Sequence, residues 1–141
     1  MVFIPKSSKF KKSFRAKPIK RISKKIEYPN IINGSIGLKI LSSGLISSSQ
    51  LQAVRQVINK IIKRIGKVRF FSFPNVTISK KSSGSRMGKG KGGKNYWVCK
   101  LQPGHMFCII NSSLINRAKQ ALKAAQFRMP VTTKIVLTNF N

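Results

Sequence analysis

The sequence almost lacks acidic residues. Its 141 residues contain one carboxylate side chain, Glu27, against 29 Lys and Arg, and the formal net charge is +28. Without Asp, and with a single His, the chain cannot assemble a pair of catalytic carboxylates, a Ser/His/Asp triad or a carboxylate site for Mg²⁺ or Ca²⁺. The composition therefore argues against an enzyme, and no cofactor or small-molecule substrate is expected.

Long apolar runs and cysteines are also scarce. No stretch approaches the roughly 18 apolar residues of a membrane span, so no membrane partner is expected. Cys99 and Cys108 lack the spacing of zinc ligands. If residues 102–105 form a turn, the two cysteines face each other across a hairpin, either as a disulfide or as half-buried thiols. The rarity of intracellular disulfides favours thiols, and the sequence alone leaves their redox state open.

The excess of positive charge indicates a polyanionic partner. A folded chain with so much like charge repels itself, and nucleic acid is the usual partner that offsets this repulsion. An anionic membrane is the competing partner, but no expected helix pairs a basic face with exposed Trp or Phe anchors. The charge is concentrated in a tail over residues 1–30 and in a glycine-rich segment over residues 81–95.

The tail carries ten Lys and Arg against Glu27. Pro5, Pro18 and Pro29 interrupt any long helix, and the segment has too few apolar side chains to form a core. We therefore expect an extended, basic RNA-binding tail that its partner orders, followed by one domain over residues 31–141. An acid-poor start of this kind also fits a mitochondrial presequence.

Hydrophobic periodicity predicts an α+β domain in which two helices pack on a mostly antiparallel sheet. The first helix is expected between a serine cap at 47–49 and Gly66, with Leu51, Val54, Ile58, Ile61, Ile62 and Ile65 facing inward. The second is expected within 111–130, capped by Asn111 or Ser112, with Leu114, Ala118, Ala121, Leu122 and Ala125 facing inward. Strands are expected at 31–41, 67–73, 76–80 as a partner of 67–73, and 131–138, with a hairpin over 96–110 that turns at Pro103-Gly104.

Residues 88–95, GKGKGGKN, are similar to a nucleotide-binding loop. The pattern G-x-x-x-x-G-K-[ST] fits as far as Lys94 and fails at Asn95, where a hydroxyl would hold Mg²⁺. Such a loop runs from a strand into a helix, whereas a strand is expected here from Tyr96 onward. We therefore interpret residues 81–95 as a projecting loop, in which glycines allow backbone amides to approach phosphates. A solvated linker is the alternative, but it would not require the six Lys and Arg of residues 80–94.

Several short motifs occur in order along nearly the whole chain. They are PKSSKFKK from Pro5, GSIGLK at 34–39, KRIGKV at 63–68, FP at 73–74, RMGKGKG at 86–92, YW at 96–97 and QPG at 102–104. Together they resemble the universal large-ribosomal-subunit protein family known in bacteria as L-sixteen. The chain departs from the family pattern in lacking acids in both helices, in Ser82 after Lys81, in Gly93-Lys94 before Asn95, and in its two cysteines.

The resemblance implies a structural protein of the large ribosomal subunit. It implies contacts with large-subunit rRNA near the A site and the peptidyl-transferase centre, with neighbouring ribosomal proteins, and with the acceptor end of A-site tRNA. The basic face of the first helix, by itself, is compatible with either solvent or RNA. With the resemblance, the expected RNA-binding residues are Lys9, Lys11, Lys12, Arg15, Arg55, Lys63, Arg64, Lys67, Lys81, Arg86, Met87, Gly88, Lys89, Gly90, Lys91, Gly92 and Lys94.

Two observations bear on the compartment. The family's opening motif already matches near Pro5, which argues against a cleavable leader. The 18 Ile and 21 Lys together exceed a quarter of the chain, a bias typical of A+T-rich coding. We therefore expect an organelle-encoded protein of the mitochondrial ribosome, in the matrix. A plastid or a bacterial cytoplasm is the alternative.

Overall fold

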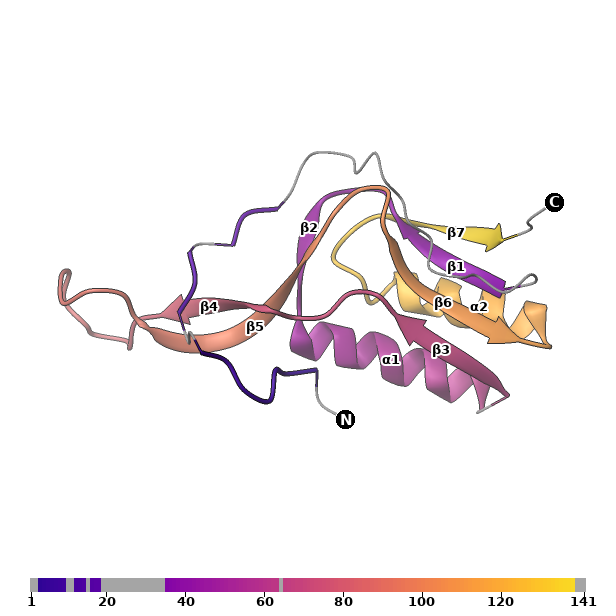
Figure 1. Ribbon diagram of the computed structural model, residues 1–141, viewed down its shortest axis with the longest axis horizontal. Coiled ribbons are helices and arrows are strands. Elements are labelled where there is room, and N and C mark those ends of the chain that lie inside the picture. Colours follow the sequence, from indigo (N-terminus) through magenta and orange to yellow (C-terminus); the bar gives the residue numbers. More distant parts are fainter. Residues whose placement is uncertain (1–2, 10–11, 15, 19–34, 64, 139–141) are drawn as a thin grey trace.

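The computed structural model describes residues 3–9, 12–14, 16–18, 35–63 and 65–138, and in it two helices pack against antiparallel sheets (Figure 1). The elements in chain order are β1 (Ser35–Ile40), β2 (Gly44–Ser47), α1 (Ser48–Ile62), β3 (Gly66–Phe70), β4 (Val76–Lys80), β5 (Gly93–Leu101), β6 (Met106–Ser112), α2 (Ile115–Gln126) and β7 (Thr133–Thr138). One sheet has the order β3-β6-β1-β7 and the other β2-β5-β4. The predicted α+β class is confirmed. The predicted division into a tail and one domain stays a prediction, because most of residues 1–34 lie outside the described ranges.

Helix α1 begins where the serine cluster predicts. Ser47 Oγ accepts a hydrogen bond from the Gln50 backbone N–H at 3.2 Å, and Gln50 Oε1 accepts one from the Ser47 N–H at 3.0 Å. This reciprocal pair satisfies two backbone donors that the first turn of a helix leaves without partners. The buried side chains of α1 are Leu51, Val54, Ile58 and Ile62, all on the predicted face.

The predicted end of α1 is wrong by three residues. Lys63 takes a left-handed conformation with φ 51°, and its N–H donates to Asn59 O at 3.1 Å, which ends the helix before Gly66. Gly66 instead starts β3. Because the helix has ended, Ile65 lies outside the apolar face and is 46% exposed.

Helix α2 packs against α1 through its small side chains. Ala118, Ala121, Leu122 and Ala125 are buried, as expected, and short side chains allow two helices to approach closely. The predicted caps are wrong, because α2 starts at Ile115 and its N-cap residue, Leu114, makes no side-chain capping bond. Ser112 Oγ accepts from the Leu114 N–H, but Ser112 lies two residues before the N-cap and so does not cap the helix, and Leu114 is 43% exposed.

The predicted hairpin over 96–110 is also wrong. The chain does turn at Gly104, which has φ 89°, but β5 pairs with β2 and β4, whereas β6 pairs with β3 and β1. Figure 1 shows β5 and β6 passing from one sheet into the other through this bend. Ile40 holds the bend by accepting from the Gly104 N–H at 2.8 Å and donating to His105 O at 2.9 Å. The strand β2, which was not predicted, supplies the pairing that β6 was expected to supply.

The strand crossing also separates the two cysteines. Cys99 lies opposite Ile46, and Cys108 lies opposite Leu38 and Phe70. Both are free thiols. Burial raises the pKa of Cys108 to about 12 and also raises that of Cys99, whose thiol additionally has hydrogen-bonding neighbours that oppose the shift. The favoured interpretation of two free thiols is confirmed, but both are buried and not half-buried, and the predicted cross-strand geometry is wrong.

Candidate nucleic-acid interface

The strands β4 and β5 and the loop 81–92 between them project from the body, and we name this unit the finger (Figure 1). Strand β4 pairs with β5, not with β3 as expected, and the last pair before the loop joins Lys80 to Gly93. The loop leads directly into a strand. A nucleotide-binding loop needs a helix at this point, so the rejection of that interpretation is confirmed.

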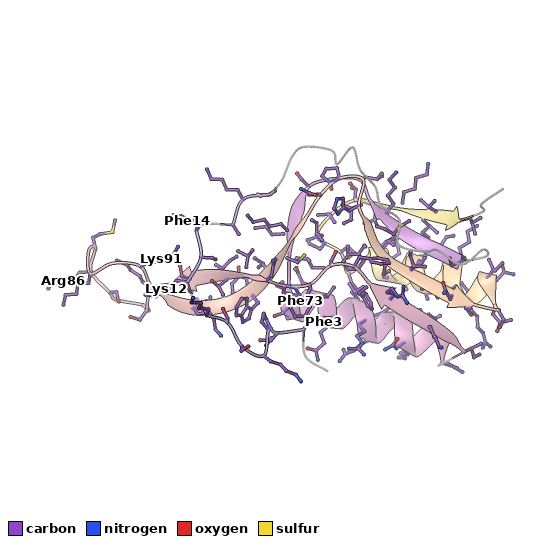
Figure 2. All side chains as sticks on the ribbon, in the orientation of Figure 1. Phe3, Lys12, Phe14, Phe73, Arg86 and Lys91 are labelled. Carbon is purple, nitrogen blue, oxygen red and sulfur yellow. The ribbon has the colours of Figure 1, made fainter. Side chains whose placement is uncertain are left out.

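The tip of the finger is shaped by left-handed backbone positions. Gly84, Gly88 and Gly90 have φ of 80°, 93° and 74°, and Lys89 has φ 53°. Glycine adopts this region without a steric cost, which explains why three of these four positions carry it. Residues 81–91 are all exposed, and Met87 is 98% exposed. Figure 2 shows Arg86 at the far end of the finger.

Short contacts within the loop fold it back on itself. Lys81 Nζ donates to Gly88 O at 2.5 Å, and the hydroxyls of Ser82 and Ser85 lie 2.7 Å apart. The Lys81 ammonium group, where the loop leaves β4, is therefore bound to a carbonyl, whereas Arg86 and Lys89 of the tip are exposed. The only carboxylate side chain of the sequence, Glu27, lies outside the described residues, so no side-chain acid in the described ranges neutralises the finger.

The neck of the finger depends on Gly92. A Cβ at this position would lie 2.5 Å from Lys80 O and 2.7 Å from Lys81 N, both backbone atoms. A Cβ at Gly93 would meet nothing within 4 Å. The two sides of the finger therefore approach closely at Gly92, and this approach requires the absence of a side chain.

The tail is attached to the finger through what we name the clasp: Lys12 and Ser13 of the tail with Thr77 and Lys91 of the finger. Lys12 Nζ donates to Lys91 O at 2.9 Å, and Lys91 Nζ donates to Ser13 O. Ser13 Oγ donates to Thr77 O at 2.9 Å and accepts from the Thr77 N–H at 3.2 Å. Figure 2 shows Lys12 and Lys91 together where the tail passes the finger. Lys12 and Lys91, both predicted to bind RNA, thus also hold the tail on the finger.

Arg55 is held in an aromatic stack. Its guanidinium lies 5.4 Å from the ring centroid of Phe3, and Phe3 in turn packs edge to face on Phe70 at 5.8 Å. Phe70 continues the stack onto the buried Phe107, also at 5.8 Å. The structure therefore gives Arg55 a part in attaching the start of the tail to the body. Its expected contact with RNA stays a prediction.

Of the remaining predicted residues, Lys94 lies on the finger, whereas Lys63 and Lys67 do not. Lys63 ends α1 and Lys67 lies in β3, and these parts of the two elements lie at the opposite end of the molecule from the finger (Figure 1). Lys94 lies on the finger with its Nζ 5.2 Å from the ring centroid of Trp97. Lys9 is exposed in the tail. Lys11, Arg15 and Arg64 lie outside the described residues.

Sequence reasoning missed the residues that attach the tail to the finger and to the body. Ser13, Thr77 and Phe3 carried no recognised motif, and no sequence spacing connects residue 13 with residue 77. The burial of Thr77, at 4% exposure, has its explanation in the clasp. The only sequence signal for the clasp was Thr77, a polar residue within an expected strand.

Fold and charge together define a class: a small α+β protein with a cationic finger and tail, an arrangement typical of proteins that associate with RNA. No helix in the described ranges is long and apolar enough to cross a bilayer. Comparison with known proteins then narrows the class to a family. The model of the family described as ribosomal protein L16p/L10e matches residues 5–136.

The sequences of curated relatives align with this chain along almost their whole length. The large ribosomal subunit protein uL16 of Maricaulis maris is 39% identical over 132 residues, which cover 94% of both chains. The large ribosomal subunit protein uL16c of Euglena longa is 38% identical over 135 residues, 96% of this chain and 98% of the relative. A uL16 protein of Leptospira biflexa is 38% identical over 136 residues, 96% of each chain. The chain belongs to the ribosomal protein L16p/L10e family. It is a structural ribosomal protein and not an enzyme, as the resemblance and the missing acids indicated.

Proposed function

We propose that this chain is a constituent of the large ribosomal subunit that binds large-subunit rRNA near the A site and the peptidyl-transferase centre. In this proposal the finger tip, residues 86–92, extends toward the acceptor end of A-site tRNA. The protein positions RNA, and the chemistry of peptide transfer belongs to the RNA.

The observation that carries the proposal is the exposed cationic finger. Arg86, Lys89 and Lys91 are exposed together on a loop whose glycine amides can approach a phosphate or sugar closely. Each lysine that neutralises a phosphate releases counterions, so binding should weaken steeply as salt rises. The names of the relatives, which are large-subunit proteins, support the same proposal.

The other basic residues are assigned by position. Lys63 and Lys67 face rRNA at the end of the body away from the finger, and the tail passes between RNA helices. Arg64, which lies outside the described residues, is assigned to rRNA on the family resemblance alone. Two separated basic regions would allow one small protein to contact RNA segments that are distant in the rRNA sequence. Neighbouring ribosomal proteins are further partners.

We assign the protein to the mitochondrial ribosome as the product of an organelle gene, on the Ile and Lys bias of its sequence. The alternatives are a bacterial cytoplasm, which the bacterial relatives support, and a plastid, which the uL16c relative from Euglena longa supports. Sequencing of purified organelle DNA tests the assignment. The gene should occur in mitochondrial DNA, and its occurrence in plastid DNA instead would contradict it.

Sedimentation tests the proposed function. The tagged full-length protein should co-migrate with large subunits through a high-salt sucrose gradient. Recovery only in a DNA-bound fraction would contradict the proposal and favour a free nucleic-acid-binding protein. A second arm uses ribosomes that carry Lys89→Ala, which should impair accommodation of aminoacyl-tRNA more than subunit assembly. Normal accommodation in subunits that all contain the variant would refute the proposed role of the finger tip.

A further inference from the structure

Phe14 is an aromatic side chain left in solvent. It is 95% exposed, although the chain buries or half-buries aromatic residues such as Phe3, Phe70 and Phe107 elsewhere. Of the phenylalanines that the structure describes, Phe127 has a comparable exposure, 90%, and it lies at the end of α2, away from the finger. Burial of an apolar ring is favourable, so a ring in this position is available to a partner.

The residues just before Phe14 are fixed. Ser13 is bonded to both the backbone N–H and the carbonyl of Thr77, and its own carbonyl accepts from Lys91 Nζ. Lys12 adds the bond to Lys91 O. Phe14 is therefore presented from an anchored backbone at the side of the finger, as Figure 2 shows. With the preceding backbone anchored, less conformational freedom of the tail is lost when a ligand binds to the ring.

Exposed cations lie close to Phe14 along the tail and in the clasp. Lys12, Lys17 and Lys91 are exposed in the same tail and finger segments. Exposed aromatic rings within a basic surface are typical of sites where proteins bind single-stranded nucleic acid, because bases stack on the rings while cations bind the phosphates.

We propose that Phe14 is a stacking site for an unpaired RNA base, beside the neck of the finger. The inference rests on the proposed RNA-binding function and adds to it a contact with a base, whereas the lysines contact phosphates. The clasp positions the ring, and the finger and tail provide the charge that brings the strand to it.

Binding of a labelled oligoadenylate of about 12 nucleotides to the full-length protein tests the site. Phe14→Ala should weaken binding by about 5- to 150-fold, the range expected for loss of one stacked base, and should leave the salt slope unchanged. Phe14→Tyr should bind like the original protein, and Phe14→Leu should bind as weakly as the alanine variant, because leucine is apolar but has no π-face. Phe127→Ala is the matched control and should leave the affinity unchanged.

Fluorescence locates the contact. The sequence has one tryptophan, Trp97, which is buried, so its emission provides a baseline. In Phe14→Trp, saturating oligoadenylate should quench the added emission, whereas in Phe127→Trp it should not.

The outcomes separate the two proposals. If Phe14→Leu keeps full affinity while Phe14→Ala loses it, the contact is apolar and stacking is refuted. If Phe14→Ala binds normally and the affinity still falls steeply with salt, stacking is refuted and the RNA-binding function stands. If the original protein shows no salt-dependent RNA binding, both proposals fail.

Discussion

Replacing Gly92 by alanine tests whether the finger depends on the close approach of its two sides. The added Cβ would lie 2.5 Å from Lys80 O, 2.6 Å from Lys80 C and 2.7 Å from Lys81 N. Ordinary van der Waals contact begins at 3.4 Å, so the two sides must separate by roughly 1 Å. All three atoms belong to the backbone, and they cannot move aside as the end of a flexible side chain can.

The expected cost of Gly92→Ala is about 1–3 kcal/mol, the usual range for an added methyl group in a tightly packed place. The strain acts on the pairing of Lys80 with Gly93, which closes the loop. It should therefore appear first as local opening of the finger and not as loss of the core, to which α1, α2 and strands of both sheets contribute. A cost of this size makes the open state of the neck about 5- to 150-fold more populated.

Amide hydrogen exchange measures this opening directly. Protection of the amides in the neck, Ser79–Lys81 and Gly93–Lys94, should fall by that factor, while protection of α1 should not change. Gly93→Ala is the matched control, because its Cβ meets nothing within 4 Å. Its effect should stay within about 0.5 kcal/mol, or about a factor of two. Equal protection in the two variants would refute the role of Gly92.

Three further predictions concern the clasp, the tail and the core. Lys89→Ala and Lys91→Ala should each reduce the salt slope of RNA binding by about one, but only Lys91→Ala should speed proteolysis of the tail; equal proteolysis would contradict the clasp. Phe3→Ala should lower the free energy of unfolding in urea by about 1–3 kcal/mol through loss of its contacts with Phe70 and Arg55, whereas Phe14→Ala should change it by less than about 0.5 kcal/mol. Because the pKa of Cys108 is raised to about 12 from a usual 9.0, folding favours its protonated form; this stabilisation is complete below pH 9 and is lost as the pH rises toward 12. Iodoacetamide at pH 9 should therefore alkylate Cys108 only after denaturation, and rapid alkylation of the folded protein would contradict the burial.

The helices could be predicted because their information is local. The spacing of Leu51, Val54 and Ile58 gives one apolar face, and Ser47 precedes it as a capping residue. The end of α1 could not be read in the same way. Gly66 was the expected left-handed residue at the end of α1, but Lys63 adopts this conformation three residues earlier. Conformational propensity alone does not exclude lysine from such a position.

Strand partners were harder to predict than strands. The pattern around Pro103-Gly104 gave the bend correctly, but a bend between adjacent strands is the same in a hairpin and in a crossing between two sheets. The difference depended on β2, four residues long and too short to give a periodic signal. Pairing is a non-local property, and the sequence of one strand carries little information about its neighbour.

The candidate site also has a part that could be predicted from the sequence and a part that could not. Composition indicated the cations of the finger, and the family resemblance indicated the tip at 86–92. The clasp joins residues 64 or more positions apart and depends on one hydroxyl, that of Ser13, meeting one buried threonine. Such a contact has no sequence signature. It also changes the interpretation of Lys12 and Lys91, which hold the tail on the finger in addition to carrying charge.

Directed hydroxyl-radical probing from the finger tip tests the central claim most directly. Met87 is 98% exposed, and both native cysteines are buried, so an iron chelate can be attached selectively to the Met87→Cys variant. In assembled large subunits, the chelate should cleave large-subunit rRNA around the A site, while a chelate on Phe127→Cys should cleave a different region. Absence of rRNA cleavage from position 87, in subunits that contain the protein, would contradict the claim that the finger binds RNA.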